Sequence, residues 1–104
     1  GQSVDSLKQE LLDATVDSVR YNILKDLITE LENIDRQEVI PYGKQLIDAA
    51  QLLQDDKKLG FAHRVMGRNY LFLSKNDSAM FFLQRSNEYF AVTGDSTNIF
   101  ANFT

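Results

Sequence analysis

The stretch VMGRNYLFLSKNDSAMFF, residues 65–82, decides the fold class. Apolar residues recur at helical spacing on both sides of the polar break SKND, which predicts one helix ending near Leu73 and another beginning near Asp77. Gly67 lies inside the first helix, where a glycine costs about 1 kcal/mol relative to alanine. No catalytic motif lies nearby, so we expect Gly67 to serve the packing of two helices.

The same periodicity extends over the rest of the chain. It predicts helices from about 5 to 14, 17 to 33, 37 to 53 and 77 to 92, and a fourth in the chain that begins within QDDKKLG, residues 54–60, and runs through Leu73. Asp5 or Ser6 is expected to cap the first helix. The segment STNIFANFT, residues 96–104, reads as the start of a further helix. We therefore predict an all-α protein of about five helices plus the start of a sixth.

Polar residues and one proline mark the predicted helix ends. Asp35, with Glu38 three residues later, resembles a capping box that has Asp in place of Ser or Thr. Pro41 leaves two alternatives: the helix begins close to residue 37 and loses one hydrogen bond, or it bends there. Gly94 suits a helix C-terminus that requires a positive φ.

Length, charge and composition argue against several classes of protein. A chain of 104 residues fits one small domain, and no segment approaches the roughly 20 apolar residues of a membrane span. The formal net charge of −4 argues against a nucleic-acid surface, because phosphate binding requires clustered Lys and Arg. The absence of cysteine excludes disulfides, thiolate metal sites and cysteine nucleophiles.

The predicted helices repeat in pairs. Asp17, Asp56 and Asp95 lie 39 residues apart (56 − 17 = 39 and 95 − 56 = 39), each just before a new apolar stripe. DKKLGFAHRV, which begins at Asp56, aligns with DSTNIFANFT, which begins at Asp95. The chain thus reads as repeat 1 over residues 17–55, repeat 2 over 56–94 and the start of repeat 3 over 95–104, preceded by an N-terminal segment over 1–16.

The second repeat resembles the tetratricopeptide repeat (TPR) family. That family's pattern of apolar, small and aromatic positions is met in register by Met66, Gly67, Tyr70, Ala79, Leu83 and Ser86. The resemblance implies antiparallel helix pairs stacked into a right-handed superhelix. It also implies that Gly67 and Ala79 face each other where two helix axes approach closely. Ile28 stands where the first repeat would be expected to have a glycine.

The TPR resemblance also implies a binding function without chemistry. The family's contact positions on the concave face fall on Asn22, Lys25, Thr29, Phe61, Arg64 and Arg68. Three of these six side chains are basic on an acidic protein, so an acidic peptide or a C-terminal carboxylate is the expected ligand. The alternative reading is a solvated helix face.

A second resemblance concerns biological context. Residues 5–31, DSLKQELLDATVDSVRYNILKDLITEL, are similar to the start of the repeat arrays in bacterial extracytoplasmic sensors such as histidine kinases. This implies a fragment of a larger signalling protein, placed in the periplasm after removal of a signal peptide, with Gly1 as a tag remnant. A cytoplasmic location stays open. The alternatives to a signalling parent are a stand-alone TPR scaffold or assembly factor and the docking arm of an enzyme.

The last segment suggests self-association. Ile99, Phe100 and Phe103 would be exposed if the sixth helix is incomplete, and dimerisation through that end is a reasonable expectation.

Chemistry-bearing residues favour structural roles in this sequence. His63 is the only histidine and is expected to pack on a helix face, and the carboxylates sit at helix ends or on polar faces. We therefore expect no enzyme activity, no metal site and no cofactor. Most of the aromatic residues of the second repeat should be core, with Phe81 and Phe82 facing different ways: Tyr70, Phe72, Phe81, Phe82, Tyr89 and Phe90.

Overall fold

Every regular element in the described part of the chain is an α-helix. The computed structural model describes residues 3–94. Its helices are α1 (Val4–Asp13), α2 (Asp17–Glu32), α3 (Arg36–Leu52), α4 (Asp56–Phe72) and α5 (Asn76–Thr93). The all-α prediction is confirmed for this range, and the helix ends fall within about one residue of the predicted ones. Residues 95–104, with Ile99, Phe100 and Phe103, lie outside the described residues.

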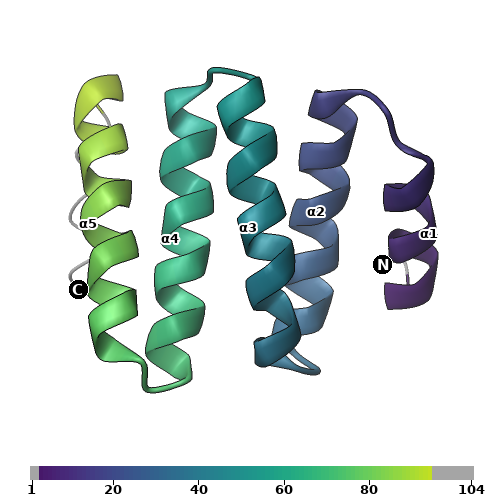
Figure 1. Cartoon of the computed structure of the whole chain (residues 1–104), viewed down its shortest axis with the longest axis horizontal. Helices are drawn as coiled ribbons and strands as arrows, with labels where there is room; N and C mark the ends of the chain where they lie inside the picture. The colour runs from purple at the N-terminus through teal and green to yellow at the C-terminus, as the bar shows by residue number, and fades with distance from the viewer. Residues whose placement is uncertain (1–2, 95–104) are drawn as a thin grey trace.

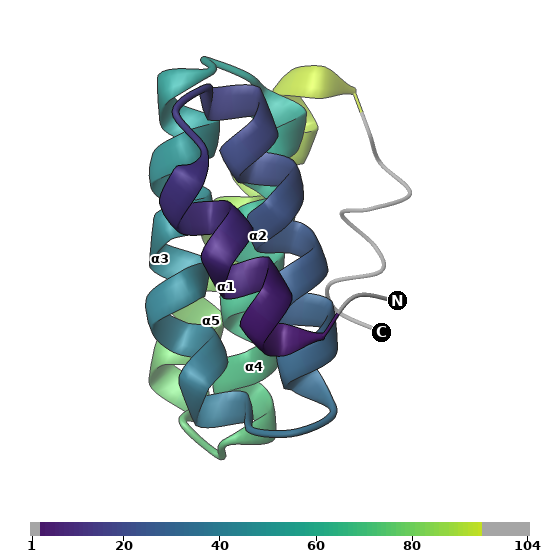
Figure 2. The same ribbon diagram turned by 90° about the vertical axis from the view of Figure 1, so that its right-hand side faces the viewer.

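Consecutive helices run antiparallel and lie in a row from α1 to α5 (Figure 1). Each helix packs mainly against its neighbours in the sequence. Seen from the α1 end, α1 lies across α2 and α3, and the later helices lie behind them (Figure 2). α2 and α4 begin 39 residues apart (56 − 17), whereas α3 and α5 begin 40 apart (76 − 36).

A core cluster that is mostly aliphatic joins α1 to α4. Fully buried leucine, isoleucine and valine side chains from successive helices fill it: Leu7, Leu24, Leu27, Ile28, Leu31, Val39, Leu46 and Val65. Burying a side chain of this kind contributes roughly 1.5 to 3 kcal/mol. The periodic spacing of these residues along each helix is what turns one face of each helix towards the core.

α4 and α5 approach each other through small residues. A Cβ atom on Gly67 would lie 2.7 Å from Leu83 Cγ and 3.2 Å from the carbonyl oxygen of Ala79. A Cβ on Gly60 would lie 2.7 Å from the Phe90 ring, and the Ser86 hydroxyl donates a hydrogen bond of 2.7 Å to the Gly60 carbonyl. Gly67 thus lies where two helices approach closely, as predicted from its position inside a helix.

Capping differs in part from the prediction. Ser3, and not Asp5 or Ser6, caps α1: its hydroxyl accepts a hydrogen bond of 3.2 Å from the Ser6 backbone N–H. The cap lies two or three residues before Asp5 and Ser6, and Ser3 has the extended conformation that an N-cap requires.

Asp35 caps α3 as predicted, accepting from the Gln37 backbone N–H at 3.1 Å. Glu38 does not complete the box: the Asp35 backbone N–H donates to the Leu31 carbonyl at 2.8 Å, and the Glu38 carboxylate binds Lys8 of α1. Pro41 lies inside α3, which begins at Arg36 and is continuous to Leu52. Gly94 ends α5 with a φ of +77°, as predicted.

The aromatic residues of α4 and α5 divide between core and surface. Phe90 is buried, and Tyr70 stacks on Phe82 with ring centroids 5.5 Å apart. Phe72 and Phe81 are 66% and 52% exposed, and the other four aromatic residues of the set are buried or half-buried. Phe81 meets Phe82 edge to face at 5.1 Å, so the two neighbours do face different ways. The guanidinium of Arg36 lies over the Phe72 ring, with Cζ 3.8 Å from the centroid.

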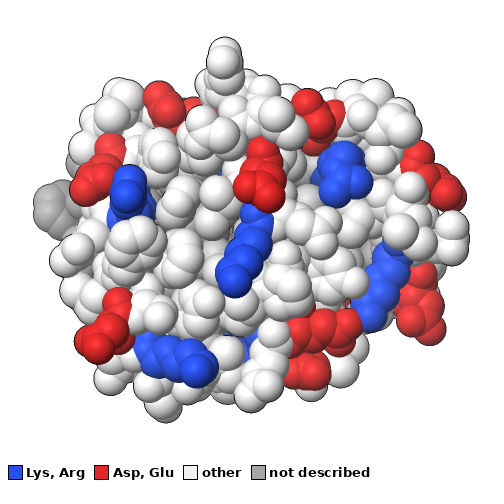
Figure 3. All heavy atoms as spheres, in the orientation of Figure 1, with Lys and Arg blue, Asp and Glu red and all other residues white. Residues whose placement is uncertain are grey.

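The surface seen in the orientation of Figure 1 carries both signs of charge interspersed, without a field of one sign (Figure 3). None of the helices in residues 3–94 is long and apolar enough to span a membrane.

Candidate functional site

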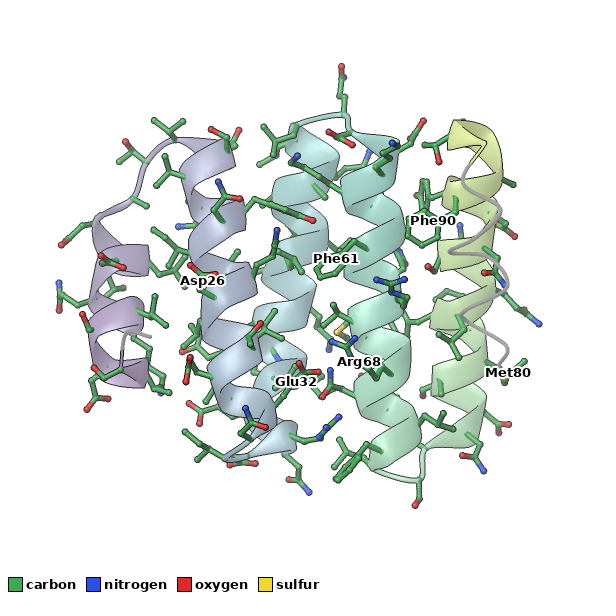
Figure 4. All side chains as sticks on the ribbon, turned by 180° about the vertical axis from the view of Figure 1, so that it is seen from behind. Asp26, Glu32, Phe61, Arg68, Met80 and Phe90 are labelled. Carbon is green, nitrogen blue, oxygen red and sulfur yellow. The ribbon has the colours of Figure 1, made fainter. Side chains whose placement is uncertain are left out.

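The six predicted contact residues lie on two helices of the row. Asn22, Lys25 and Thr29 belong to α2, and Phe61, Arg64 and Arg68 belong to α4. Within each helix the spacing of three and four residues places them along one stripe. We call this surface the α2/α4 face. Figure 4, seen from behind, shows Glu32 of α2 next to Arg68 of α4, with Phe61 further along α4.

Phe61 is the centre of the α2/α4 face. Its ring is half-buried, with Lys25 Nζ 5.6 Å from the centroid and Arg64 Cζ 5.5 Å from it. Lys25 also lies 5.7 Å from the ring of Tyr21, and Arg64 lies 5.7 Å from the ring of Phe90. Cations at this distance are attracted by the negative face of an aromatic ring. The structure therefore brings together three of the six predicted residues, two cations and the aromatic ring between them.

Tyr21 and Lys58 extend this centre towards the N-terminus of α4. Lys58 Nζ lies 5.3 Å from the Tyr21 centroid and 3.4 Å from a carboxylate oxygen of Asp55. Burial, with a smaller contribution from the Asp55 charge, raises the pKa of Tyr21 to about 12, so the phenol is neutral at physiological pH. The pKa of Asp55 is lowered, chiefly because its carboxylate accepts a hydrogen bond from the Lys58 backbone N–H. Asp55 caps α4 through the same bond.

Arg68 has an intramolecular carboxylate partner. Its Nε and Nη2 atoms lie 3.0 to 3.2 Å from the two carboxylate oxygens of Glu32, a forked ion pair that links α4 to α2. Arginine favours this planar geometry with carboxylates. The carboxylate expected from a partner is thus supplied at this position by the chain itself.

Asn69 joins the same network, and the sequence did not single it out. Its side chain is fully buried, and its amide nitrogen donates to Glu32 and to the Val65 carbonyl, both at 2.8 Å. Its amide oxygen accepts from Arg36 at 3.4 Å. The signal that could have found it is a polar residue in core register, one helical turn after Val65.

Asn22 and Thr29 lie at the exposed edge of the face. The Thr29 hydroxyl donates a hydrogen bond of 2.9 Å to the Lys25 carbonyl in its own helix. The α2/α4 face therefore has a network fixed by Glu32 at one end and a centre of cations and rings around Phe61 at the other.

His63 has a packing environment on the side of α4 that meets α5. Its ring lies 5.2 Å from that of Tyr89 and 5.9 Å from that of Phe82, and Nδ1 is 2.8 Å from the Leu59 carbonyl oxygen. Burial lowers its pKa more than the hydrogen bond to Leu59 raises it, and the charge of Arg85 lowers it further. Among residues 3–94 no three His, Asp or Glu side chains form a group that could hold a metal ion.

Comparison of the chain with protein-family models, with curated proteins and with solved structures gave no match in any of the three.

Proposed function

We propose that the chain is a non-enzymatic protein-interaction module that binds an acidic peptide segment on the α2/α4 face. The observation that carries this proposal is the centre around Phe61, where Lys25 and Arg64, from two different helices, flank one half-buried ring. An acidic side chain placed between these cations gains charge-assisted hydrogen bonds, and an adjoining apolar group gains contact with the ring.

The helix arrangement supports the same proposal. Helix pairs that begin 39 and 40 residues apart pack in sequence order. A TPR-like repeat array would have the same spacing and packing order, which supports the proposal. In such an array the first helix of each pair lines a preformed binding surface, so little conformational entropy is lost on binding. On the TPR reading, residues 17–55 and 56–94 are the two repeats, and the parent is a bacterial signalling protein.

Arg68 was expected to contact the partner, but in this proposal it has a structural role. Its guanidinium is bound to Glu32 and fixes α4 against α2. In this proposal the partner contacts Lys25, Phe61 and Arg64 around the ring, with Asn22 and Thr29 at the edge.

A peptide selection tests the proposal. A phage-displayed random peptide library is selected on the chain, and the enriched peptides are measured against variants by fluorescence polarisation. We expect peptides rich in Asp and Glu, with affinity that falls as salt is raised. Lys25→Glu with Arg64→Glu should weaken binding by at least about tenfold, since each lost charged contact is worth about 1.5 to 3 kcal/mol.

The matched control is Lys44→Glu with Lys57→Glu, which changes net charge equally at two exposed lysines outside the α2/α4 face. Circular dichroism checks that each variant is helical. If Arg64→Glu unfolds the chain, the single variant Lys25→Glu is compared with the single variant Lys44→Glu instead. Equal loss in variant and control would refute a specific face, because it would reduce the effect to net charge.

A further inference from the structure

A pocket separate from the α2/α4 face lies where α1, α2 and α3 meet. Its volume is about 410 Å³, and six residues line it: Lys8, Leu11, Leu12, Arg20, Tyr42 and Gln45. None of them belongs to the centre around Phe61 or to the Glu32 network. The pocket can therefore be occupied or altered independently of the proposed peptide site.

Arg20 is the cation that distinguishes this pocket. Its guanidinium is half-buried and makes two hydrogen bonds of 3.3 Å, from Nη1 to the Leu11 carbonyl and from Nη2 to the Gln45 side-chain oxygen. Both acceptors are neutral, and within residues 3–94 no carboxylate forms an ion pair with Arg20. A guanidinium carries five N–H donors in a fixed fork. Arg68, by contrast, has both oxygens of Glu32.

The second cation of the pocket is already neutralised. Lys8 binds the carboxylate of Glu38 and lies 6.0 Å from the Tyr42 ring centroid. The hydrogen bond to Glu38 raises the pKa of Lys8, so it is charged at neutral pH. The positive charge that lacks a counter-ion in the pocket therefore belongs to Arg20.

The remaining lining is largely apolar. Leu11 is buried in the core cluster, and the Tyr42 ring is half-buried. Leu12 lines the same pocket and is 79% exposed. Apolar surface next to an unneutralised guanidinium suits a ligand that has both characters.

We propose that this pocket binds a carboxylate that carries a short apolar group. The carboxylate takes a forked ion pair with Arg20, and the apolar group covers Leu12 and the Tyr42 ring. Two sources share this chemistry, a small free carboxylic acid and the C-terminal residue of a peptide that ends in an apolar side chain.

Nuclear magnetic resonance with small probes tests the inference. Hexanoate and its neutral analogue hexanamide are titrated into the ¹⁵N-labelled chain at neutral pH. Hexanoate should shift the amides of Leu12, Arg20 and Gln45 saturably, and hexanamide should bind at least about tenfold more weakly because it cannot form the ion pair. Equal binding of the two probes, or shifts that do not saturate at these amides, would overturn the proposal.

Two variants and one control assign the effect to the pocket. Arg20→Gln should weaken hexanoate binding by at least about tenfold, whereas Arg85→Gln should not, because Arg85 is exposed on α5 and lies 5.3 Å from the Phe81 centroid. Leu12→Asp adds a repelling charge at a side chain that the fold leaves exposed, so it should weaken binding even if Arg20→Gln does not fold. Unchanged affinity in Leu12→Asp contradicts the proposal.

A third comparison separates the two sources. The acetylated tripeptide Ala-Ala-Leu is titrated with a free and with an amidated C-terminus. Tighter binding of the free tripeptide than of hexanoate identifies a peptide C-terminus, and the reverse order identifies a small acid. Because the lining shares no residue with the α2/α4 face, Lys25→Glu should leave hexanoate binding unchanged, which keeps failure here distinct from failure of the proposed function.

Discussion

The α2/α3 pair and the α4/α5 pair differ in which helix carries the large side chains. The first helix carries them in α2/α3, and the second helix carries them in α4/α5. In the first pair Tyr21 and Ile28 of α2 are buried. The positions 39 residues later on α4 are Gly60 and Gly67. A bulky first helix in one pair thus corresponds to a first helix with two glycines in the other.

The second helices show the reverse distribution. α3 has Gly43 and Ala50, and the positions 40 residues later on α5 are Leu83 and Phe90. Leu83 and Phe90 are the side chains that a Cβ on Gly67 and on Gly60 would meet. A Cβ on Gly43 would instead meet Met66 of α4, outside its own pair. The comparison teaches that a small residue is matched by a large one on whichever helix packs against it, which is the pair partner for Gly60 and Gly67 and the next pair for Gly43.

Gly67→Ile should break this arrangement most severely. It gives α4 the residue that α2 has at Ile28, but the new side chain must enter space held by Leu83 and the Ala79 carbonyl. We expect a loss of about 3 kcal/mol in the free energy of unfolding, at the upper end for overpacking. Urea denaturation followed by circular dichroism measures it.

Leu83→Ala is the test of the pairing. Alone it should lower the free energy of unfolding by about 2 to 5 kcal/mol. The double variant Gly67→Ile with Leu83→Ala should lose less stability than the sum of the losses in the two single variants. Strictly additive losses would mean that the two positions do not share one space. Gly43→Ala is the matched control, because its new Cβ would overlap only the flexible side chain of Met66; we expect it to cost less than about 1 kcal/mol.

His63→Leu sharpens the comparison through pH. The position 39 residues earlier is Leu24, so the substitution makes α4 resemble α2. Because burial lowers the folded-state pKa of His63, the unfolded chain binds the proton more readily. Stability is then full above the unfolded pKa of about 6.5 and falls as pH drops through and below it.

Thermal denaturation of both proteins between neutral pH and pH of about 5 measures this dependence. The His63→Leu variant should lose less stability on acidification than the parent. The idea fails if the two proteins lose equal stability over that range.

Gln54→Gly should have a small stabilising effect. Gln54 follows α3 with a φ of +52°, and Ser74 follows α4 with a φ of +62°, a left-handed conformation that glycine adopts without a steric penalty. We expect Gln54→Gly and Ser74→Gly each to raise the free energy of unfolding by about 0.5 to 1 kcal/mol. The shift in denaturation midpoint measures this change. Gln51→Gly, inside α3, is the control and should destabilise by about 1 kcal/mol.

Prediction from sequence succeeded where the signals are local. Helix ends, the Asp35 cap and the positive φ of Gly94 depend on residues within one or two turns, so spacing and cap chemistry were sufficient. It failed for the cap of α1, where Ser3 is one of several adjacent polar residues that could serve.

The candidate site was only partly predictable. Helical spacing placed Lys25, Phe61 and Arg64 on helix surfaces, but the ring contacts between them join α2 to α4. Arg68 seemed available from its position alone, and its partner Glu32 lies 36 residues away.

The sequence by itself determined an all-α chain, the position of each helix in residues 3–94 and the presence of glycines at a close contact. These features follow from hydrogen bonding and side-chain spacing within a helix. Only the tertiary structure decided which aromatic rings face solvent, that Glu32 is bound by Arg68 and Asn69, and that Arg20 faces a pocket without a carboxylate. The physical reason is that these outcomes depend on how helices distant in sequence dock, and periodicity along one helix carries no information about the side chains that another helix brings to it.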